Sequence, residues 1–268
     1  MMGRLLLRVV VALVLVFLML PLLSVIIASF SAGAPLVFPP TGFTSEPYFS
    51  IGQDFVSAAQ NSLLIGALTA LLATTIGTFT ALALQRGVLP GRQVLATLCL
   101  SPLMVPTLVI GVSGYQFLLV VWDVVGLSFA DTFLAIVLGH SAFTLPLVIR
   151  SVLAAHAHYD MRLEEAGANL GATPSQVFFR VTLPLLTPGI VAGSAFAFLM
   201  SFDDVPVALF LGGPSTVTLP VKIFTSIEFS FDASIMAVAT VVVAISLMLM
   251  LLIDRFVGLA PVFGMERR

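Results

Sequence analysis

Between two long apolar runs lies the stretch Glu164-Glu165-Ala166-Gly167-Ala168-Asn169-Leu170-Gly171, which leads after nine further residues to Val181-Thr182-Leu183-Pro184. Hydrophobic residues make up 59% of the chain and charged residues only 9%, so most of the sequence suits lipid rather than water. Because charges are costly in hydrocarbon, a polar segment in such a chain has to contact water or another protein. This segment therefore separates two membrane spans and is the first candidate for a functional region.

The first half of the segment has the features of a short helix that stops abruptly. Asp160 is placed to cap the start of the helix, and Glu164 and Glu165 fall in the first turn, where negative charge suits the helix dipole. Gly171 supplies a left-handed end. Residues 166–168 are small, so they form a low surface that a groove of another protein can approach closely.

A second helix is predicted directly after this stop. Thr173 is a suitable N-cap, Pro174 suits the first helical position, and Gln176 completes a capping box with Thr173. The segment is thus predicted to form two short helices with a sharp bend between them.

In its spacing the segment resembles the cytoplasmic EAA loop of permease subunits of ABC importers, with the pattern Glu-Ala-Ala, three residues, Gly, nine residues and Ile-x-Leu-Pro. The chain departs from this pattern at Gly167, which replaces the second Ala, and at Val181, which replaces Ile. The resemblance implies a coupling helix that docks on a separate ATPase subunit. The residues that it implicates are Glu164, Glu165, Ala166, Gly167, Ala168 and Gly171. The alternative interpretation is an ordinary solvated loop.

Uncharged apolar runs of about 20 residues, the length that crosses a bilayer, recur along the chain. They cover residues 9–30, 55–85, 93–122, 132–149, 181–202 and 233–253. We therefore predict an all-α, polytopic membrane protein with six transmembrane helices and a cytoplasmic coupling-helix loop between the fourth and the fifth. Residues 1–268 are expected to form one permease domain, with a transmembrane core over residues 55–258 and an anchor helix and outer loop over residues 1–54.

Prolines and glycines inside two of these spans predict local irregularity. The third span contains Pro102 and Pro106, which remove two backbone donors and bend the helix, either as a packing kink or as a gate. The fifth contains Gly189 and Gly193, whose spacing favours close helix packing over a chemical role.

The basic residues indicate the orientation of the spans, because loops that stay in the cytoplasm are rich in Lys and Arg. The chain has 11 such residues, and all except Lys222 fall on one side of the predicted spans. They are Arg4, Arg8, Arg86, Arg92, Arg150, Arg162, Arg180, Arg255, Arg267 and Arg268. We therefore expect both termini and the 164–184 segment in the cytoplasm. The resemblance to permeases of ABC importers implies in addition that the chain lies in a bacterial inner membrane.

The sequence lacks the residues of an ATP site. A phosphate-binding loop ends in Gly-Lys-Ser or Gly-Lys-Thr, whereas the only lysine, Lys222, follows Val221. We therefore predict that the chain is not an enzyme and binds no cofactor, and that ATP and Mg²⁺ bind to a partner ATPase if the chain is an ABC permease. We assign no metal role to its histidines, and the single cysteine, Cys99, excludes an intrachain disulfide.

Two adjacent carboxylates, Asp203 and Asp204, follow the fifth apolar run. Ionisable residues inside a membrane are functional candidates by default, because their burial is costly. Three roles remain open for the pair. It binds a protonated amine, with Phe202 adding a cation–π face; it pairs with an arginine of a partner subunit; or it caps a helix break before Pro206. The candidate residues of a solute pathway are therefore Phe202, Asp203 and Asp204.

Three further motifs resemble the permeases of spermidine/putrescine-type importers. They are Ser-Phe-Asp-Asp at 201–204, Leu-Gly-Gly-Pro at 211–214 and Thr-Leu-Pro-Val-Lys-Ile at 218–223. The resemblance covers residues 5–258 and implies import of a small cationic or amine-bearing solute. It also implies partners: an ATPase dimer, a second and different permease, an extracytoplasmic solute-binding protein and the lipid bilayer, but no nucleic acid.

Three alternatives stand beside this interpretation. A secondary transporter would need an ion-coupling site and usually an internal repeat, and the sequence shows no convincing repeat. An ABC permease for a different small organic solute fits the same coupling motif. An intramembrane aspartyl protease would carry its two aspartates on different helices, whereas Asp203 and Asp204 are neighbours.

Overall fold

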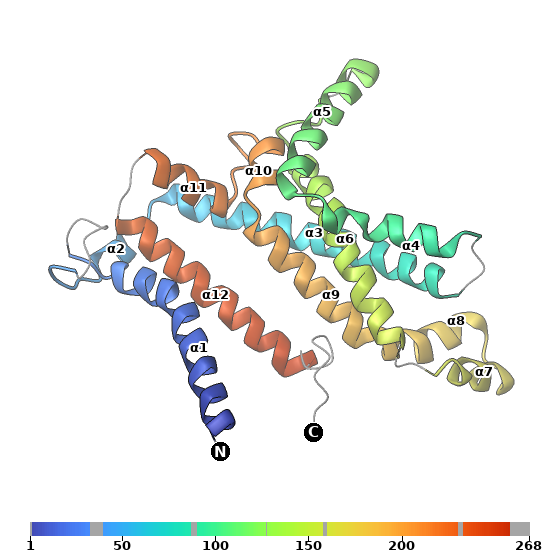
Figure 1. The fold of residues 1–268 in the computed structure, drawn as a ribbon. Helices are drawn as coiled ribbons and strands as arrows, with labels where there is room; N and C mark the ends of the chain where they lie inside the picture. Colours follow the sequence, from blue (N-terminus) through green and yellow to red (C-terminus); the bar gives the residue numbers. More distant parts are fainter. Residues whose placement is uncertain are drawn as a thin grey trace. The chain divides into compact units, whose positions relative to one another are not determined.

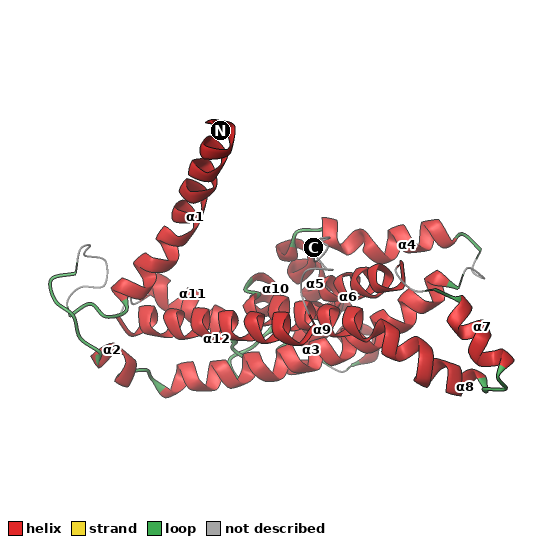
Figure 2. Ribbon diagram, turned by 90° about the horizontal axis from the view of Figure 1, so that it is seen from below, coloured by secondary structure: helices red, strands yellow, loops and turns green. Residues whose placement is uncertain are grey.

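The computed structural model describes residues 2–32, 40–86, 90–126, 128–157, 160–229 and 233–257. Within these residues the elements are helices, and extended backbone pairs only in an isolated antiparallel bridge between Ser31 and Phe43 (Figure 2). The prediction of an all-α protein is confirmed. The chain divides into two compact units, residues 1–57 with 222–248 and residues 58–221 with 249–268.

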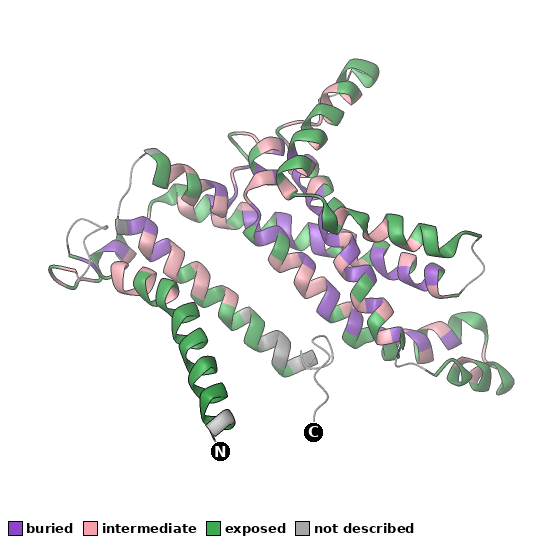
Figure 3. Cartoon of the chain, in the orientation of Figure 1, coloured by how far each residue is buried: buried purple, intermediate pink, exposed green. Residues whose placement is uncertain are grey.

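The first unit is built from five helices or parts of helices. They are α1 (Met2–Ala28), α2 (Glu46–Phe49), the first residues of α3 (Gln53–Gln85), most of α11 (Leu219–Phe229) and much of α12 (Ala233–Val257). α1 is rich in Leu and Val yet exposed over most of its length (Figure 3), as expected of a helix whose surroundings are lipid or other subunits. Ser29, directly after α1, and Tyr48 of α2 share a hydrogen bond of 2.7 Å, which joins the two helices.

The second unit contains the remainder of α3 and the elements up to α10. They are α4 (Arg92–Leu100), the 3₁₀ turn η1 (Ser101–Met104), α5 (Thr107–Val125), α6 (Phe133–Ala157), α7 (Arg162–Asn169), α8 (Pro174–Val177), the π-helical turn η2 (Phe178–Thr182), α9 (Leu183–Asp203) and α10 (Pro206–Leu211). α6 and α9 lie side by side (Figure 1).

Two glycines of α9 allow this close approach. A Cβ atom at Gly189 would lie only 2.5 Å from the Cβ of Ala155 and 2.6 Å from the carbonyl oxygen of Ser151. One at Gly193 would lie 2.9 Å from the Cα of Val148. Since real side chains do not tolerate such distances, the prediction that these glycines serve helix packing is confirmed.

The core of the second unit gathers residues of α3, α6 and α9. Ala73, Ile149 and Leu186, one from each helix, are fully buried in one cluster. Gly77 of α3 meets α6 in the same way, because a Cβ there would lie 2.9 Å from that of Val148. α3 and α9 therefore both pack closely against α6.

The third predicted span is two helices rather than one bent helix over residues 93–122. α4 ends at Leu100, η1 follows, Val105 is extended, and α5 begins only at Thr107. Pro102 and Pro106 explain the break, because neither has an N–H to donate to the preceding turn. The two prolines thus end one helix and start another.

Five described helical stretches are long and apolar enough to cross a membrane. They are Arg4–Ala28, Gln53–Gln85, Thr107–Val125, Phe133–Ala157 and Pro174–Asp203. The sixth predicted span falls in α12, where the fully described apolar stretch, Ser234–Met248, is shorter. The prediction of a polytopic helical protein is confirmed, with the fourth and fifth spans longer than expected.

Candidate functional site

The first candidate region is the turn between α7 and α8. A carboxylate oxygen of Asp160 accepts a hydrogen bond of 3.0 Å from the backbone N–H of Arg162, the first residue of α7. At the other end Gly171 has a φ of +85°, and the N–H of Ala172 donates to the carbonyl oxygen of Gly167 at 3.2 Å. These bonds form a left-handed helix stop. The predicted start and end of this helix are confirmed.

The start of α8 is also as predicted. Thr173 accepts a hydrogen bond from the N–H of Gln176 at 3.3 Å, and the Gln176 side chain accepts one from the N–H of Thr173 at 2.8 Å. This capping box fixes the direction in which the chain leaves the turn. The bend between the two helices is therefore set by local bonds at both of its ends.

The structure separates the predicted coupling residues into two groups. Glu165, Ala166 and Ala168 are exposed. Glu164 and Gly167 instead turn towards the segment that leads into α9. The carboxylate of Glu164 accepts a hydrogen bond from the Thr182 hydroxyl, and a Cβ at Gly167 would lie 3.4 Å from a methyl carbon of Val177.

Apolar side chains around the turn were not singled out from the sequence. Leu163 is 48% exposed, Leu170 is 89% exposed, and Phe179 in η2 is 62% exposed. These three side chains give the polar turn an exposed apolar surface. Their position in the polar segment between the fourth and fifth predicted spans was the signal that could have identified them.

The second candidate region is the corner between α9 and α10. α9 ends at Asp203, and the backbone of Asp204 is extended, with φ −73° and ψ 133°. One carboxylate oxygen of Asp204 accepts hydrogen bonds from the N–H groups of Val207 at 2.8 Å and Ala208 at 3.3 Å. Of the three roles considered for the pair, capping of a helix break is thus the one that Asp204 performs in this structure.

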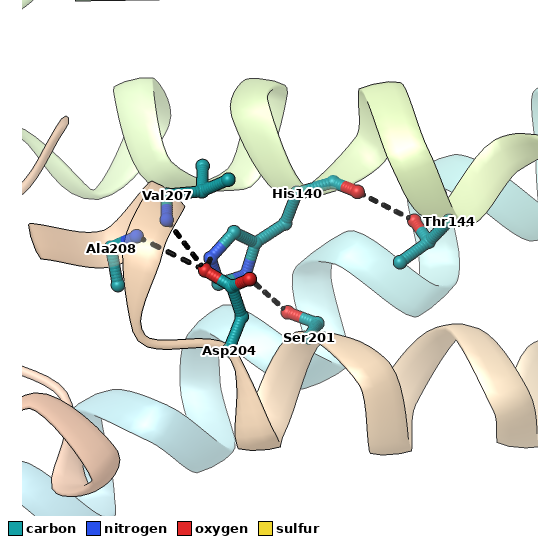
Figure 4. A network of polar contacts seen from close by, with 6 residues as sticks. All are labelled: His140, Thr144, Ser201, Asp204, Val207 and Ala208. Atoms are coloured by element: carbon teal, nitrogen blue, oxygen red, sulfur yellow. Dashed lines mark hydrogen bonds and ion pairs between the residues drawn. The ribbon is translucent and has the colours of Figure 1, made fainter. Parts of the chain in front are cut away.

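A buried histidine of α6 joins both sides of this corner. His140 Nδ1 lies 2.6 Å from the Ser201 hydroxyl oxygen in α9, and His140 Nε2 lies 3.4 Å from the same carboxylate oxygen of Asp204 (Figure 4). His140 is fully buried, and Ser201 and Asp204 are nearly so. The carbonyl oxygen of His140 in turn accepts a 2.8 Å hydrogen bond from Thr144, one turn further along α6.

This Ser201–His140–Asp204 network has the connectivity of a hydrolase triad, but its surroundings indicate a structural role. The three side chains are packed among helices, and the Asp204 oxygen nearest the imidazole already accepts two backbone hydrogen bonds. The network therefore links α6 to the α9–α10 corner, and we call these three residues, Ser201, His140 and Asp204, the clasp. The sequence analysis quoted Ser201 only within the motif at 201–204 and did not connect it with His140, although a histidine inside an apolar span was a usable signal.

The three predicted pathway residues lie in different surroundings. Phe202 is only 6% exposed, and its ring stacks on Phe198 with centroids 5.8 Å apart. Asp204 is buried in the network, whereas Asp203 is exposed. Asp203 is therefore the member of the group whose carboxylate is open to a ligand or to another subunit.

Comparison with known proteins gives concordant matches. Residues 73–260 match the family model described as binding-protein-dependent transport system inner membrane component. The putrescine transport system permease protein PotI of Escherichia coli (strain K12) is 33% identical over 84% of this chain and 81% of that protein. The spermidine/putrescine transport system permease protein PotC of the same organism is 30% identical over 94% of this chain and 93% of that protein.

A solved structure with the same fold comes from a bacterial ABC transporter involved in the import of the acidic polysaccharide alginate. It superposes with a TM-score of 0.73, covering 94% of this chain and 96% of that one, at 14% sequence identity. At this identity the likeness concerns the fold alone.

Proposed function

Because the chain belongs to the family of binding-protein-dependent transport system inner membrane components, we propose that it is the permease of an ABC importer that carries a small cationic amine such as putrescine or spermidine. Two observations support the proposal together. The α7–α8 turn is capped at its bend and exposes Glu165, and the chain is similar to two polyamine permeases over most of its length.

In this proposal the α7–α8 turn docks on an ATPase dimer that binds ATP and Mg²⁺. Leu163, Leu170 and Phe179 would be covered at that contact, which would remove their apolar surface from water. The turn and both chain termini face the cytoplasm, as the distribution of arginines indicates. A second permease, a different chain, and an extracytoplasmic solute-binding protein complete the assembly in a bacterial inner membrane.

Asp203 is the proposed contact for the solute amine. An aliphatic amine titrates near 10.4, so the solute is charged at neutral pH and needs a carboxylate to replace part of its hydration. Asp203 is the last residue of the apolar helix α9 and is exposed, whereas the carboxylate of Asp204 accepts hydrogen bonds from backbone N–H groups. The proposal therefore narrows from the aspartate pair to Asp203.

The same fold also serves very different solutes, so an ABC permease for another organic solute is the alternative. The structural neighbour belongs to an importer of an acidic polysaccharide, for which an exposed carboxylate would be unfavourable. The charge of Asp203 thus favours a cationic solute over an anionic one.

The test measures uptake of labelled putrescine by vesicles that contain the chain with its cognate ATPase, partner permease and solute-binding protein. Asp203→Asn keeps the size of the side chain and should lower uptake about tenfold, the factor expected for loss of one charge-assisted contact. Asp123→Asn, which neutralises another exposed aspartate near the end of α5, is the matched control and should transport normally. Normal uptake by the Asp203 variant at equal expression would reject the amine contact.

A further inference from the structure

Glu164 and Glu165 are adjacent in sequence but differ in their surroundings. Glu165 is exposed, whereas Glu164 is half-buried and its carboxylate accepts a hydrogen bond from the Thr182 hydroxyl, 18 residues further along the chain. Thr182 is itself fully buried. A hydroxyl held against a carboxylate in such a site makes a strong, directional link. The two glutamates are therefore suited to different tasks.

Thr182 is the last residue of η2, the π-helical turn from which α9 continues. The N–H of Leu183 donates to the carbonyl oxygen of Phe178, five residues earlier. π-helical turns are rare and widen the helix by one residue, and they are frequent at functional sites. Because η2 joins the α7–α8 turn to α9, it is the point at which a displacement of α7 would reach α9.

Apolar contacts also hold α7 against the segment that leads into α9. Gly167 packs against α8 and η2, since a Cβ atom there would lie in ordinary contact, 3.4 Å from a methyl carbon of Val177 and 3.9 Å from one of Val181. α7 is thus packed on α8 and η2, and the hydrogen bond between Glu164 and Thr182 links it to the residue directly before α9. α9 in turn packs tightly against α6 through Gly189 and Gly193.

We propose that Glu164 is a positioning residue that transmits displacement of α7 to α9 through Thr182, and that Glu165 is the glutamate of the pair that contacts the ATPase. The inference rests on the proposed docking of the α7–α8 turn. It assigns Glu164 to the interior of the permease, although the sequence motif places both glutamates in one docking surface.

The experiment uses the complete importer in proteoliposomes and measures solute uptake, ATP hydrolysis and retention of the ATPase. Thr182→Val keeps the volume of the side chain and removes the donor, and Glu164→Ala removes the acceptor. Each should lower uptake per ATP about tenfold, the factor that corresponds to one charge-assisted hydrogen bond, with the ATPase retained. The double variant should be no worse than either single one.

Conservative variants separate the link from a merely structural role. Thr182→Ser and Glu164→Gln keep a donor and an acceptor, so both should retain most of the uptake per ATP. An unchanged ratio in Thr182→Val, together with ATPase loss in Glu164→Ala, would overturn the proposal and make Glu164 a docking contact. If Thr182→Val does not accumulate in membranes, Glu164→Ala alone decides, because it releases the ATPase only if Glu164 touches it.

Glu165→Lys distinguishes failure of this inference from failure of the docking proposal. If the turn docks as proposed, this reversal of an exposed charge should weaken retention of the ATPase. Normal retention and hydrolysis would overturn the docking proposal, and with it this inference. Weakened retention in Glu165→Lys, combined with normal uptake per ATP in Thr182→Val and Glu164→Ala, would overturn the Glu164–Thr182 link alone.

Discussion

The α7–α8 turn and the α9–α10 corner are both places where polar residues interrupt an apolar chain, but they are stabilised differently. In the turn, Asp160, Gly171 and the Thr173–Gln176 capping box bond to neighbours a few residues away. At the corner, Asp204 caps α10 and also lies against His140, which comes from α6 and binds Ser201. Local bonds fix the helix ends of the turn, and Glu164 adds one bond to Thr182, whereas the corner is held by a separate long helix, α6.

This difference matches the proposed tasks of the two regions. A turn that is stabilised locally can move as a unit when a partner pushes on its exposed face. A corner that is clasped to a neighbouring helix keeps Asp203 in a fixed position relative to α6. Energy from ATP hydrolysis would enter at the first region and act on the solute at the second.

The largest effect is expected from breaking the clasp. Asp204→Ala removes the acceptor of two backbone N–H groups and leaves His140 Nε2 buried without its carboxylate. We expect a loss of about 3 kcal/mol of folding free energy, as for other buried polar pairs with one partner removed. The loss should be measured as a lower melting temperature of the chain purified in detergent.

Asp204→Asn is the matched control, because the amide oxygen still accepts from the backbone and asparagine is an effective cap. It should melt between the wild type and Asp204→Ala. Equal melting temperatures for Asp204→Ala and the wild type would mean that the corner does not depend on the clasp.

A smaller effect on stability, but a large one on coupling, is expected at Gly171. Its φ of +85° is strained for a β-branched residue, so Gly171→Val should cost about 1–2 kcal/mol locally and change the direction of the turn. The variant should insert normally and hydrolyse ATP with its partners but import little solute. Uptake per ATP in vesicles measures this directly.

Two controls isolate the position of the strain. Gly171→Asn tolerates the left-handed conformation and should remain coupled. Gly91→Val places the same strain, at a φ of +69°, before α4 and away from the turn, and should also remain coupled. If Gly171→Val imported solute as well as the wild type, the turn would not be the coupling element.

The smallest effect is expected from the capping box. Thr173→Ala removes one of its two bonds and should destabilise α8 by about 1 kcal/mol, without disturbing the corner. Hydrogen exchange at the Gln176 amide should then be about fivefold faster, with α10 amides unchanged. Equal protection of Gln176 in both proteins would show that the capping box does not stabilise α8.

The contrast between local bonds in the turn and a long-range contact at the corner also explains which features the sequence predicts. Asp160, Gly171, Thr173 and Gln176 act on residues nearby in the chain, so their roles could be predicted from spacing alone. His140 and Ser201 meet across 61 positions, and no local pattern indicates such a contact. The capping role of Asp204 was one of three open roles, because only the path of the chain after Val205 selects it.

Two further differences have equally physical causes. Glu164 was grouped with Glu165, and only the structure brings it to Thr182. We expected a bend at residues 101–106, and the structure has a complete break there. Prolines can either kink or end a helix, and the packing around them, which the local sequence does not specify, decides between the two. The six apolar runs, by contrast, follow from composition, since each needs only lipid or another helix around it.

The most direct test of the proposed function is whether uptake by this chain depends on ATP hydrolysed by a separate subunit. Labelled putrescine is offered to proteoliposomes that contain the chain alone, or the chain with its ATPase, partner permease and solute-binding protein, each with and without ATP. We predict uptake only from the complete set supplied with ATP, because the chain has no phosphate-binding loop. Accumulation of putrescine by the chain alone without ATP would contradict this and identify a secondary transporter.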